Sequence, residues 1–120
     1  MNKPTLVLGA SGNPERYSYI ATVRLRKHGH TVFPVGIKAG VIEGLDIQTN
    51  RPYYKNVDTV TLYIGPKNQP EWYDYILSLK PKRLIFNPGT ENDILFKKAS
   101  EAGIDCIEAC TLVLLSIDNY

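Results

Sequence analysis

The sequence predicts an α/β protein in which helices cover both faces of an open parallel sheet of about five strands, a three-layer arrangement. Short apolar runs rich in β-branched residues alternate with segments of helical spacing, and clusters of glycine, proline and asparagine separate them. The 120 residues, 43% of them apolar, suffice for one hydrophobic core and leave no room for a second domain of ordinary size. We therefore expect residues 1–120 to form one domain.

The first 35 residues predict a strand, a helix and a second strand. Thr5–Leu8 is a short buried strand that ends at the turn residues Gly9–Pro14. Apolar residues recur at helical spacing over Tyr17–His28, and Gly29 supplies the stop. Thr31–Val35 follows as the second strand. Such a unit connects parallel strands by a right-handed crossover.

The next segment, residues 36–56, is rich in glycine with weak periodicity, so we expect irregular structure with at most a short hairpin around Glu43–Gly44. Asp58–Ile64 is then the third strand. Pro70 and Glu71 suit the first turn of a helix that runs to about Leu79.

The last part of the chain predicts a strand over Arg83–Phe86, a helix over Glu91–Ala102 and a fifth strand over Ile104–Glu108. The tail Thr111–Ile117 suits either a helix or a strand. We expect a Rossmann-like sheet with the strand order 3-2-1-4-5 and a crevice at the carboxyl end of the first strand.

Composition excludes several classes of protein. The 14 basic and 12 acidic residues give a net charge of +2, which predicts neither nucleic acid nor a membrane as the main partner. No stretch approaches the roughly 20 apolar residues of a membrane span, and no signal peptide is evident, so we expect a cytoplasmic protein. Two cysteines, Cys106 and Cys110, are expected to be thiols.

The loop Gly9–Pro14 is the first candidate binding element. It links a strand to a helix, where backbone N–H groups and the helix dipole attract an anion. Gly9 and Gly12 permit a tight turn and close approach of a phosphate, while Ser11, Asn13 and Ser18 offer side-chain hydrogen bonds. The alternative is that these residues are present only as turn formers and helix caps.

The end of the second strand indicates which nucleotide is bound. The Gly-x-Gly-x-x-Gly fingerprint and the nucleoside triphosphate loop are both absent. An NAD site has an acidic residue after the second strand, whereas here Gly36 and Lys38 follow it. A cation suits a phosphorylated ribose, as in coenzyme A (CoA) or NADP. A solvated surface lysine is the alternative.

Two further loops lie at the predicted carboxyl edge. Pro66 and Asn68, with Lys67 between them, follow the third strand, and Asn87 and Gly89 follow the fourth. We include these four flanking residues, with Gly12 and Gly36, among the candidate cofactor-binding residues. Thr90 as a helix N-cap would explain the fourth-strand loop without a ligand.

These residues, in order, resemble the family of small stand-alone CoA-binding proteins related to the nucleotide-binding domain of the succinyl-CoA synthetase α subunit. The similarity covers approximately residues 4–118. It is carried by Val7–Ser11, Asn13–Arg16, Ser18–Tyr19, Val32–Val35 with Lys38 and Gly40, and Val57–Val60.

The resemblance implies binding of the 3′-phospho-ADP portion of CoA. Gly9, Ala10 and Ser11 would approach the diphosphate, and Asn13 and Ser18 would fix the loop and the helix start. Lys38 would meet the ribose phosphate, while Pro66 and Asn68 would line the adenine side. The chain departs from relatives at Ile64–Lys67, where many have an arginine-rich turn, and at Gly36, where asparagine is common.

Catalytic chemistry is not evident in these loops. The ligase relatives use a phosphorylated histidine, but His28 and His30 fall at the amino side of the sheet. Cys110 follows the fifth strand near the crevice and is expected to be buried and inert, with Cys106 in the core. The alternative is that an activated Cys110 thiol forms a mixed disulfide with CoA. No metal-spaced set or carboxylate pair is visible, so we expect a protein that is not an enzyme.

Three functions therefore remain open from the sequence. The first is a module that binds CoA or an acyl-CoA without catalysis. The second is a small NADP-binding oxidoreductase or a cofactor-binding subunit, in which Lys38 reads the 2′-phosphate. The third is a structural subunit whose apolar end, Leu112–Leu115, docks a partner or a second copy as a homodimer.

Overall fold

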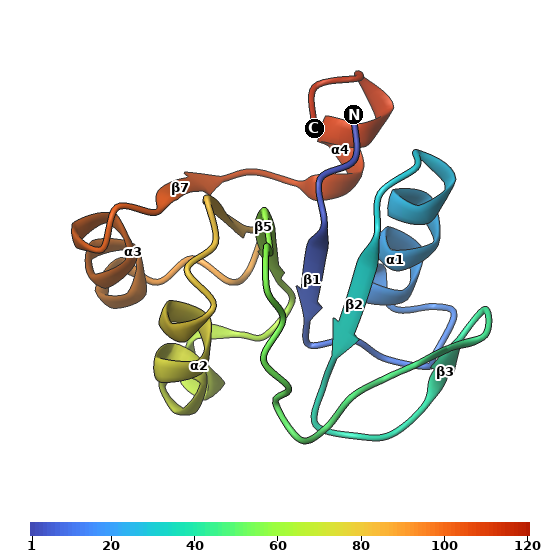
Figure 1. The fold of residues 1–120 in the computed structure, drawn as a ribbon, viewed down its shortest axis with the longest axis horizontal. Coiled ribbons are helices and arrows are strands. Elements are labelled where there is room, and N and C mark those ends of the chain that lie inside the picture. The colour runs from blue at the N-terminus through green and yellow to red at the C-terminus, as the bar shows by residue number, and fades with distance from the viewer.

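A computed structural model describes residues 1–120 and shows a parallel five-stranded sheet between two helical layers (Figure 1). The sheet strands are β1 (Thr5–Leu8), β2 (Val32–Val35), β5 (Thr59–Leu62), β6 (Arg83–Phe86) and β7 (Asp105–Glu108). The helices are α1 (Tyr17–Lys27), α2 (Tyr73–Ser78), α3 (Asp93–Glu101) and α4 (Thr111–Ser116). The predicted three-layer α/β class is confirmed.

Alternation along the strands divides the core between the two faces of the sheet. Leu6 and Leu8 of β1 pack in the cluster that contains Ile76 of α2 and Leu95 of α3. Val7, which points to the opposite face, packs in the cluster that contains residues of α1 and α4. Both faces are therefore covered, as parallel sheets require.

The predicted strand order 3-2-1-4-5 is wrong for the five full strands. The observed order is β2-β1-β5-β6-β7. The third of these strands along the chain, β5, therefore pairs with β1 and does not lie at the outer edge of β2. The outer edge of β2 is occupied instead by Gln48, which forms a single parallel bridge with Val35. Backbone hydrogen bonds from Gly36 to Gln48 and from Gln48 to Pro34 fix that contact. One residue thus replaces the strand that we expected there.

The segment after β2 is irregular, as predicted, and its hairpin is short. Strands β3 (Val41–Ile42) and β4 (Leu45–Asp46) pair in antiparallel fashion around Glu43 and Gly44. After β5, two 3₁₀ turns, η1 (Pro66–Asn68) and η2 (Pro70–Trp72), precede α2. The predicted helix over Pro70–Leu79 is therefore divided into a 3₁₀ turn and a short α-helix.

One detail at a helix end differs from expectation. Thr90 is not the N-cap of α3, because Asn92 occupies that position and its side chain accepts hydrogen bonds from Ile94 and Leu95. The Thr90 hydroxyl instead donates to the carbonyl of Asn87 at 2.8 Å. The tail, which suited either helix or strand, forms the helix α4. None of the helices has the length and apolar character needed to span a membrane.

Candidate functional site

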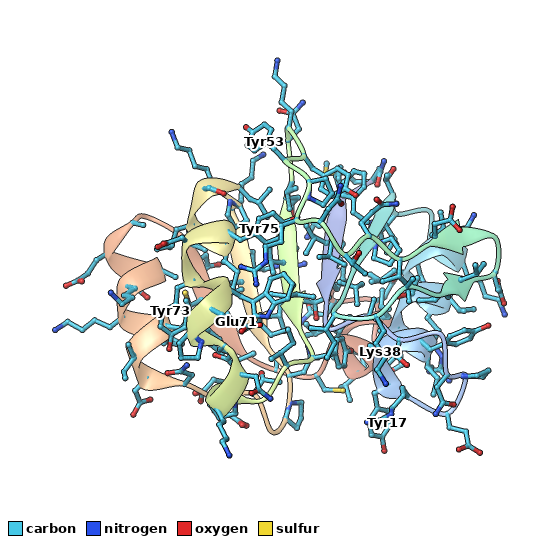
Figure 2. The ribbon with its side chains drawn as sticks, turned by 90° about the horizontal axis from the view of Figure 1, so that it is seen from below. Tyr17, Lys38, Tyr53, Glu71, Tyr73 and Tyr75 are labelled. Carbon is cyan, nitrogen blue, oxygen red and sulfur yellow. The ribbon has the colours of Figure 1, made fainter.

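A cleft of about 810 Å³ lies at the carboxyl edge of the sheet, between the loops that follow β1, β2, β5 and β6. Figure 2 looks onto this edge and shows Lys38 and Glu71 on opposite sides of it. Eight of the residues predicted to bind a cofactor line the cleft: Gly9, Ala10, Ser11, Gly12, Ser18, Lys38, Asn68 and Gly89. Strand ends that are far apart in sequence therefore contribute to one concave site, as in other open α/β sheets.

The loop after β1 is held tightly against the strand ends. The backbone N–H groups of Gly9 and Ala10 both donate to the carbonyl of Val35, at 2.9 and 3.0 Å. Gly9 has a φ of +95°, and a β carbon there would lie 2.9 Å from the backbone of Tyr63. A side chain is excluded on both grounds. The tight turn predicted at Gly9 is thus a requirement of the packing.

The same loop and the start of α1 present backbone donors that the protein does not use. The N–H groups of Ser11, Gly12, Tyr17 and Ser18 make no hydrogen bond within the protein. No side chain caps the N-terminus of α1, whose N-cap residue is Arg16. Unused donors at a helix N-terminus, together with its dipole, suit a phosphate group.

Two cations, Lys38 and Arg16, line the cleft and have no carboxylate partner. Lys38 follows β2 and Arg16 precedes α1, so the two cations come from different loops at the carboxyl edge of the sheet. The one ion pair within 4.0 Å in the protein joins Arg51 to Glu71. Arg16 was absent from the residues predicted to bind, although a basic residue directly before a helix in this position is the signal that could have identified it.

The opposite wall of the cleft is built around Gln69, a fully buried residue. Its amide nitrogen donates to the carbonyls of Ile64 and Thr90 at 2.8 and 2.7 Å, and its oxygen accepts from Asn92 at 2.8 Å. This side chain therefore ties the loop after β5 to the loop after β6. Sequence reasoning missed it, since burial and not residue type gives it this role.

Beside Gln69, Trp72 lines the cleft and is 2% exposed. The guanidinium of Arg51 lies 3.9 Å from the centre of its ring, and Glu71 holds that guanidinium through an ion pair of 3.7 Å. Glu71 is the only carboxylate in the cleft lining. This end of the cleft is therefore less positive than the end beside Lys38.

Four predicted binding residues lie outside the cleft lining. Asn13 accepts a hydrogen bond from the backbone of Glu15, and so shapes the loop. Gly36 lies against Ala10, and Pro66 begins the exposed turn η1. The buried Asn87 side chain donates to Thr61 and Leu62 and accepts from the Thr111 backbone. Asn87 thus fixes α4 to the strand ends.

The histidines lie at the other edge of the sheet, as predicted. The backbone N–H of Lys3 donates to Nδ1 of His30 at 2.9 Å, and His28 ends α1. Both cysteines are half-buried free thiols, so Cys110 is less buried than we expected, and Cys106 packs at the margin of the core. Neither a histidine nor a cysteine lines the cleft.

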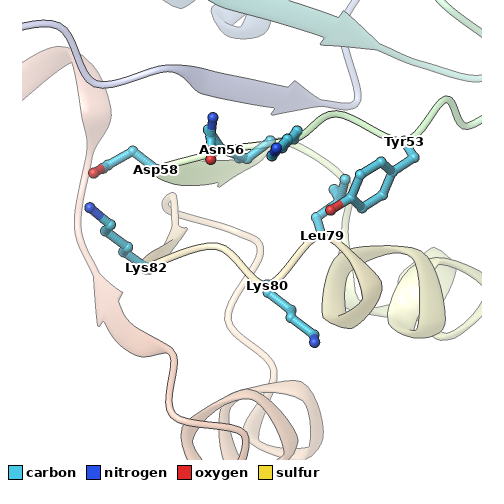
Figure 3. Close-up of a pocket in the computed structure, with 8 residues that line it drawn as sticks. Tyr53, Asn56, Asp58, Leu79, Lys80 and Lys82 are labelled. Carbon is cyan, nitrogen blue, oxygen red and sulfur yellow. The ribbon is translucent and has the colours of Figure 1, made fainter.

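A second cavity, of about 470 Å³, lies at the amino edge of the sheet (Figure 3). It is lined by Tyr53, Lys55, Asn56, Val57, Asp58, Leu79, Lys80 and Lys82. Its three lysines are solvent-exposed, and it contains none of the predicted binding residues. The carboxyl edge is the expected ligand position in a parallel sheet, so the larger cleft is the better candidate.

Comparison with known proteins identifies the family of the chain. A family model described as a CoA binding domain matches residues 3–116, nearly the whole chain. The chain belongs to the CoA-binding domain family. A comparison with curated protein sequences found no match.

Solved structures share the fold of this CoA-binding domain. An uncharacterised protein of 53% identity superposes with a TM-score of 0.98, over 100% of this chain and 99% of that one. A hypothetical protein from Pyrococcus horikoshii OT3 has 28% identity and a TM-score of 0.84, over 92% of this chain and 80% of its own. A conserved hypothetical protein from Pyrococcus furiosus has 28% identity and a TM-score of 0.79, over 92% and 97%.

Proposed function

We propose that this CoA-binding domain binds CoA, or an acyl-CoA, through the 3′-phospho-ADP portion and does so without catalysis. The observation that carries the proposal is the meeting of the Gly9–Gly12 loop, Lys38 and Arg16 in one cleft. The diphosphate would accept hydrogen bonds from the unused N–H groups of that loop and of the first residues of α1. Lys38 would contact the 3′-phosphate.

The chemistry of the cleft supports binding without catalysis. Its one carboxylate, Glu71, is paired with Arg51. Tyr63 also lines the cleft, but burial raises the pKa of its phenol, and the nearby Cys110 thiol raises it further, so Tyr63 stays protonated at neutral pH. The lining therefore contains no pair of side chains suited to general acid–base catalysis near neutral pH.

Isothermal titration calorimetry with CoA tests the proposal. We expect saturable binding with one site per chain, and tighter binding of CoA than of NADPH. Absence of heat from CoA at millimolar concentration would refute CoA binding, and tighter binding of NADPH would favour a small NADP-binding oxidoreductase. Incubation with acetyl-CoA should release free thiol no faster than buffer alone. Faster release would refute the non-catalytic part of the proposal.

A further inference from the structure

Two exposed apolar side chains lie in the cleft beside Lys38. Tyr17, the first residue of α1, is 71% exposed, and Ile37, which follows β2, is 75% exposed. Both belong to the cleft lining together with Lys38. Figure 2 shows Tyr17 and Lys38 at the same corner of the carboxyl edge.

The Tyr17 ring has no structural task within the protein. Its hydroxyl makes none of the side-chain hydrogen bonds in the protein. The ring takes part in none of the aromatic or cation–π contacts. Isolated exposed aromatic residues are common and need no explanation. This one lies beside a cation and unused backbone donors, including its own N–H group.

The covalent structure of the ligand connects these features. In a nucleoside 3′-phosphate the base and the phosphate are attached to the same ribose. Only the width of that sugar ring therefore separates the base from the phosphate. A phosphate on Lys38 therefore brings the base to the part of the cleft that Tyr17 and Ile37 line. Flat bases gain free energy by stacking on an aromatic face, whichever base they are.

We propose that Tyr17 stacks on the adenine of the bound ligand and that Ile37 contacts the same base. This inference rests on the proposed CoA binding and adds the residues that recognise the base. It replaces the expectation that Pro66 and Asn68 line the adenine side. Neither the Tyr17 ring face nor the Ile37 side chain forms hydrogen bonds, so the recognition is for a flat base that carries a 3′-phosphate and discriminates little between adenine and guanine.

Calorimetry with CoA and with 3′,5′-ADP on Tyr17→Phe and Tyr17→Ala tests the proposal. Tyr17→Phe keeps the ring and should bind both ligands as the wild type does. Tyr17→Ala should weaken both by about five- to 150-fold, the effect of losing one stack. Tyr53→Ala is the matched control, because Tyr53 is 68% exposed and lines the cavity at the opposite edge, so this variant should bind as the wild type.

A nuclear magnetic resonance measurement separates stacking from a general loosening of the loop. The adenine H2 and H8 resonances of 3′,5′-ADP should shift upfield on saturation with the wild type or with Tyr17→Phe, because of the ring current. Saturation with Tyr17→Ala should abolish most of that shift. An unchanged affinity or an unchanged shift in Tyr17→Ala would overturn the stacking proposal, whereas CoA binding itself would stand. Failure of the wild type to bind CoA would refute the proposed function instead.

Discussion

The α carbon of Gly36 lies against the loop after β1, so closely that a β carbon on Gly36 would come within 2.6 Å of the carbonyl oxygen of Ala10. Real β carbons do not approach backbone oxygen so closely, and a backbone atom cannot rotate away as a side chain can. Gly36 is thus the residue that lets the Gly9–Gly12 loop sit against the end of β2. The position of the unused N–H donors depends on this contact.

Replacing Gly36 with alanine should displace the loop after β1. We expect the free energy of unfolding to fall by about 1–3 kcal/mol, the usual effect of overpacking, and CoA binding to weaken. Gly65→Ala is the matched stability control, because a β carbon at Gly65 would contact nothing within 4 Å. Urea denaturation of both variants measures the difference, and equal stability of the two would contradict the steric explanation.

The sequence predicted the elements of the sheet well because their signals are local. Thr5–Leu8 and Arg83–Phe86 each end in three consecutive apolar residues, all of them buried, as expected of parallel strands that are covered on both faces. The strand order was not predictable in the same way. It depends on Gln48, whose single bridge to Val35 covers the edge of β2, and one bridged residue leaves no periodic pattern.

The candidate site was predictable where it consists of backbone groups and of a charged side chain. The Gly9–Gly12 loop and Lys38 carry composition signals that place them at strand ends, and the structure brings both into the cleft. Asn87 lies outside the cleft lining, because its amide is engaged with Thr61 and Thr111 beneath the cleft. Gln69 was missed because only the folded chain shows that it is buried between two loops.

Gln69→Leu should both destabilise the protein and weaken ligand binding. The substitution leaves the carbonyls of Ile64 and Thr90 and the amide of Asn92 without this partner, so we expect a loss of about 2–4 kcal/mol in the free energy of unfolding. Gln48→Leu is the control, because the Gln48 side chain makes no hydrogen bond within the protein. A loss in Gln69→Leu no larger than in Gln48→Leu would show that the buried hydrogen bonds contribute little.

His30 should make stability depend on pH. Its Nδ1 accepts from the backbone of Lys3, which requires the neutral ring, and burial, with the N-terminal ammonium and nearby cations, lowers the pKa of His30 below 6.5. The unfolded chain, in which the pKa of histidine is about 6.5, therefore binds a proton more readily than the folded chain does. The contribution of the neutral His30 to stability is fully present above about pH 6.5 and is lost as the pH falls through the lower pKa of the folded state.

The comparison of wild type with His30→Asn isolates this effect. Urea denaturation midpoints measured at pH 7.5 and 5.5 should fall more steeply in the wild type than in the variant, whose side-chain oxygen can accept the Lys3 hydrogen bond at either pH. His28→Asn, at the exposed end of α1, controls for the loss of a histidine near the same edge. Identical pH dependence in the wild type and His30→Asn would exclude His30 as the source.

Lys38→Ala should separate the 3′-phosphate from the rest of the ligand. Lys38 lies in the cleft without a carboxylate partner, so its ammonium is free to contact the phosphate. We expect CoA binding to weaken by about 1–2 kcal/mol, the scale of one charge-assisted hydrogen bond, while the affinity for dephospho-CoA changes little. Calorimetry of both ligands at one fixed, low ionic strength measures this, with Lys55→Ala at the opposite edge as the control. Equal losses for the two ligands would mean that Lys38 does not read the 3′-phosphate, and that Arg16 or the backbone donors of α1 hold that group instead.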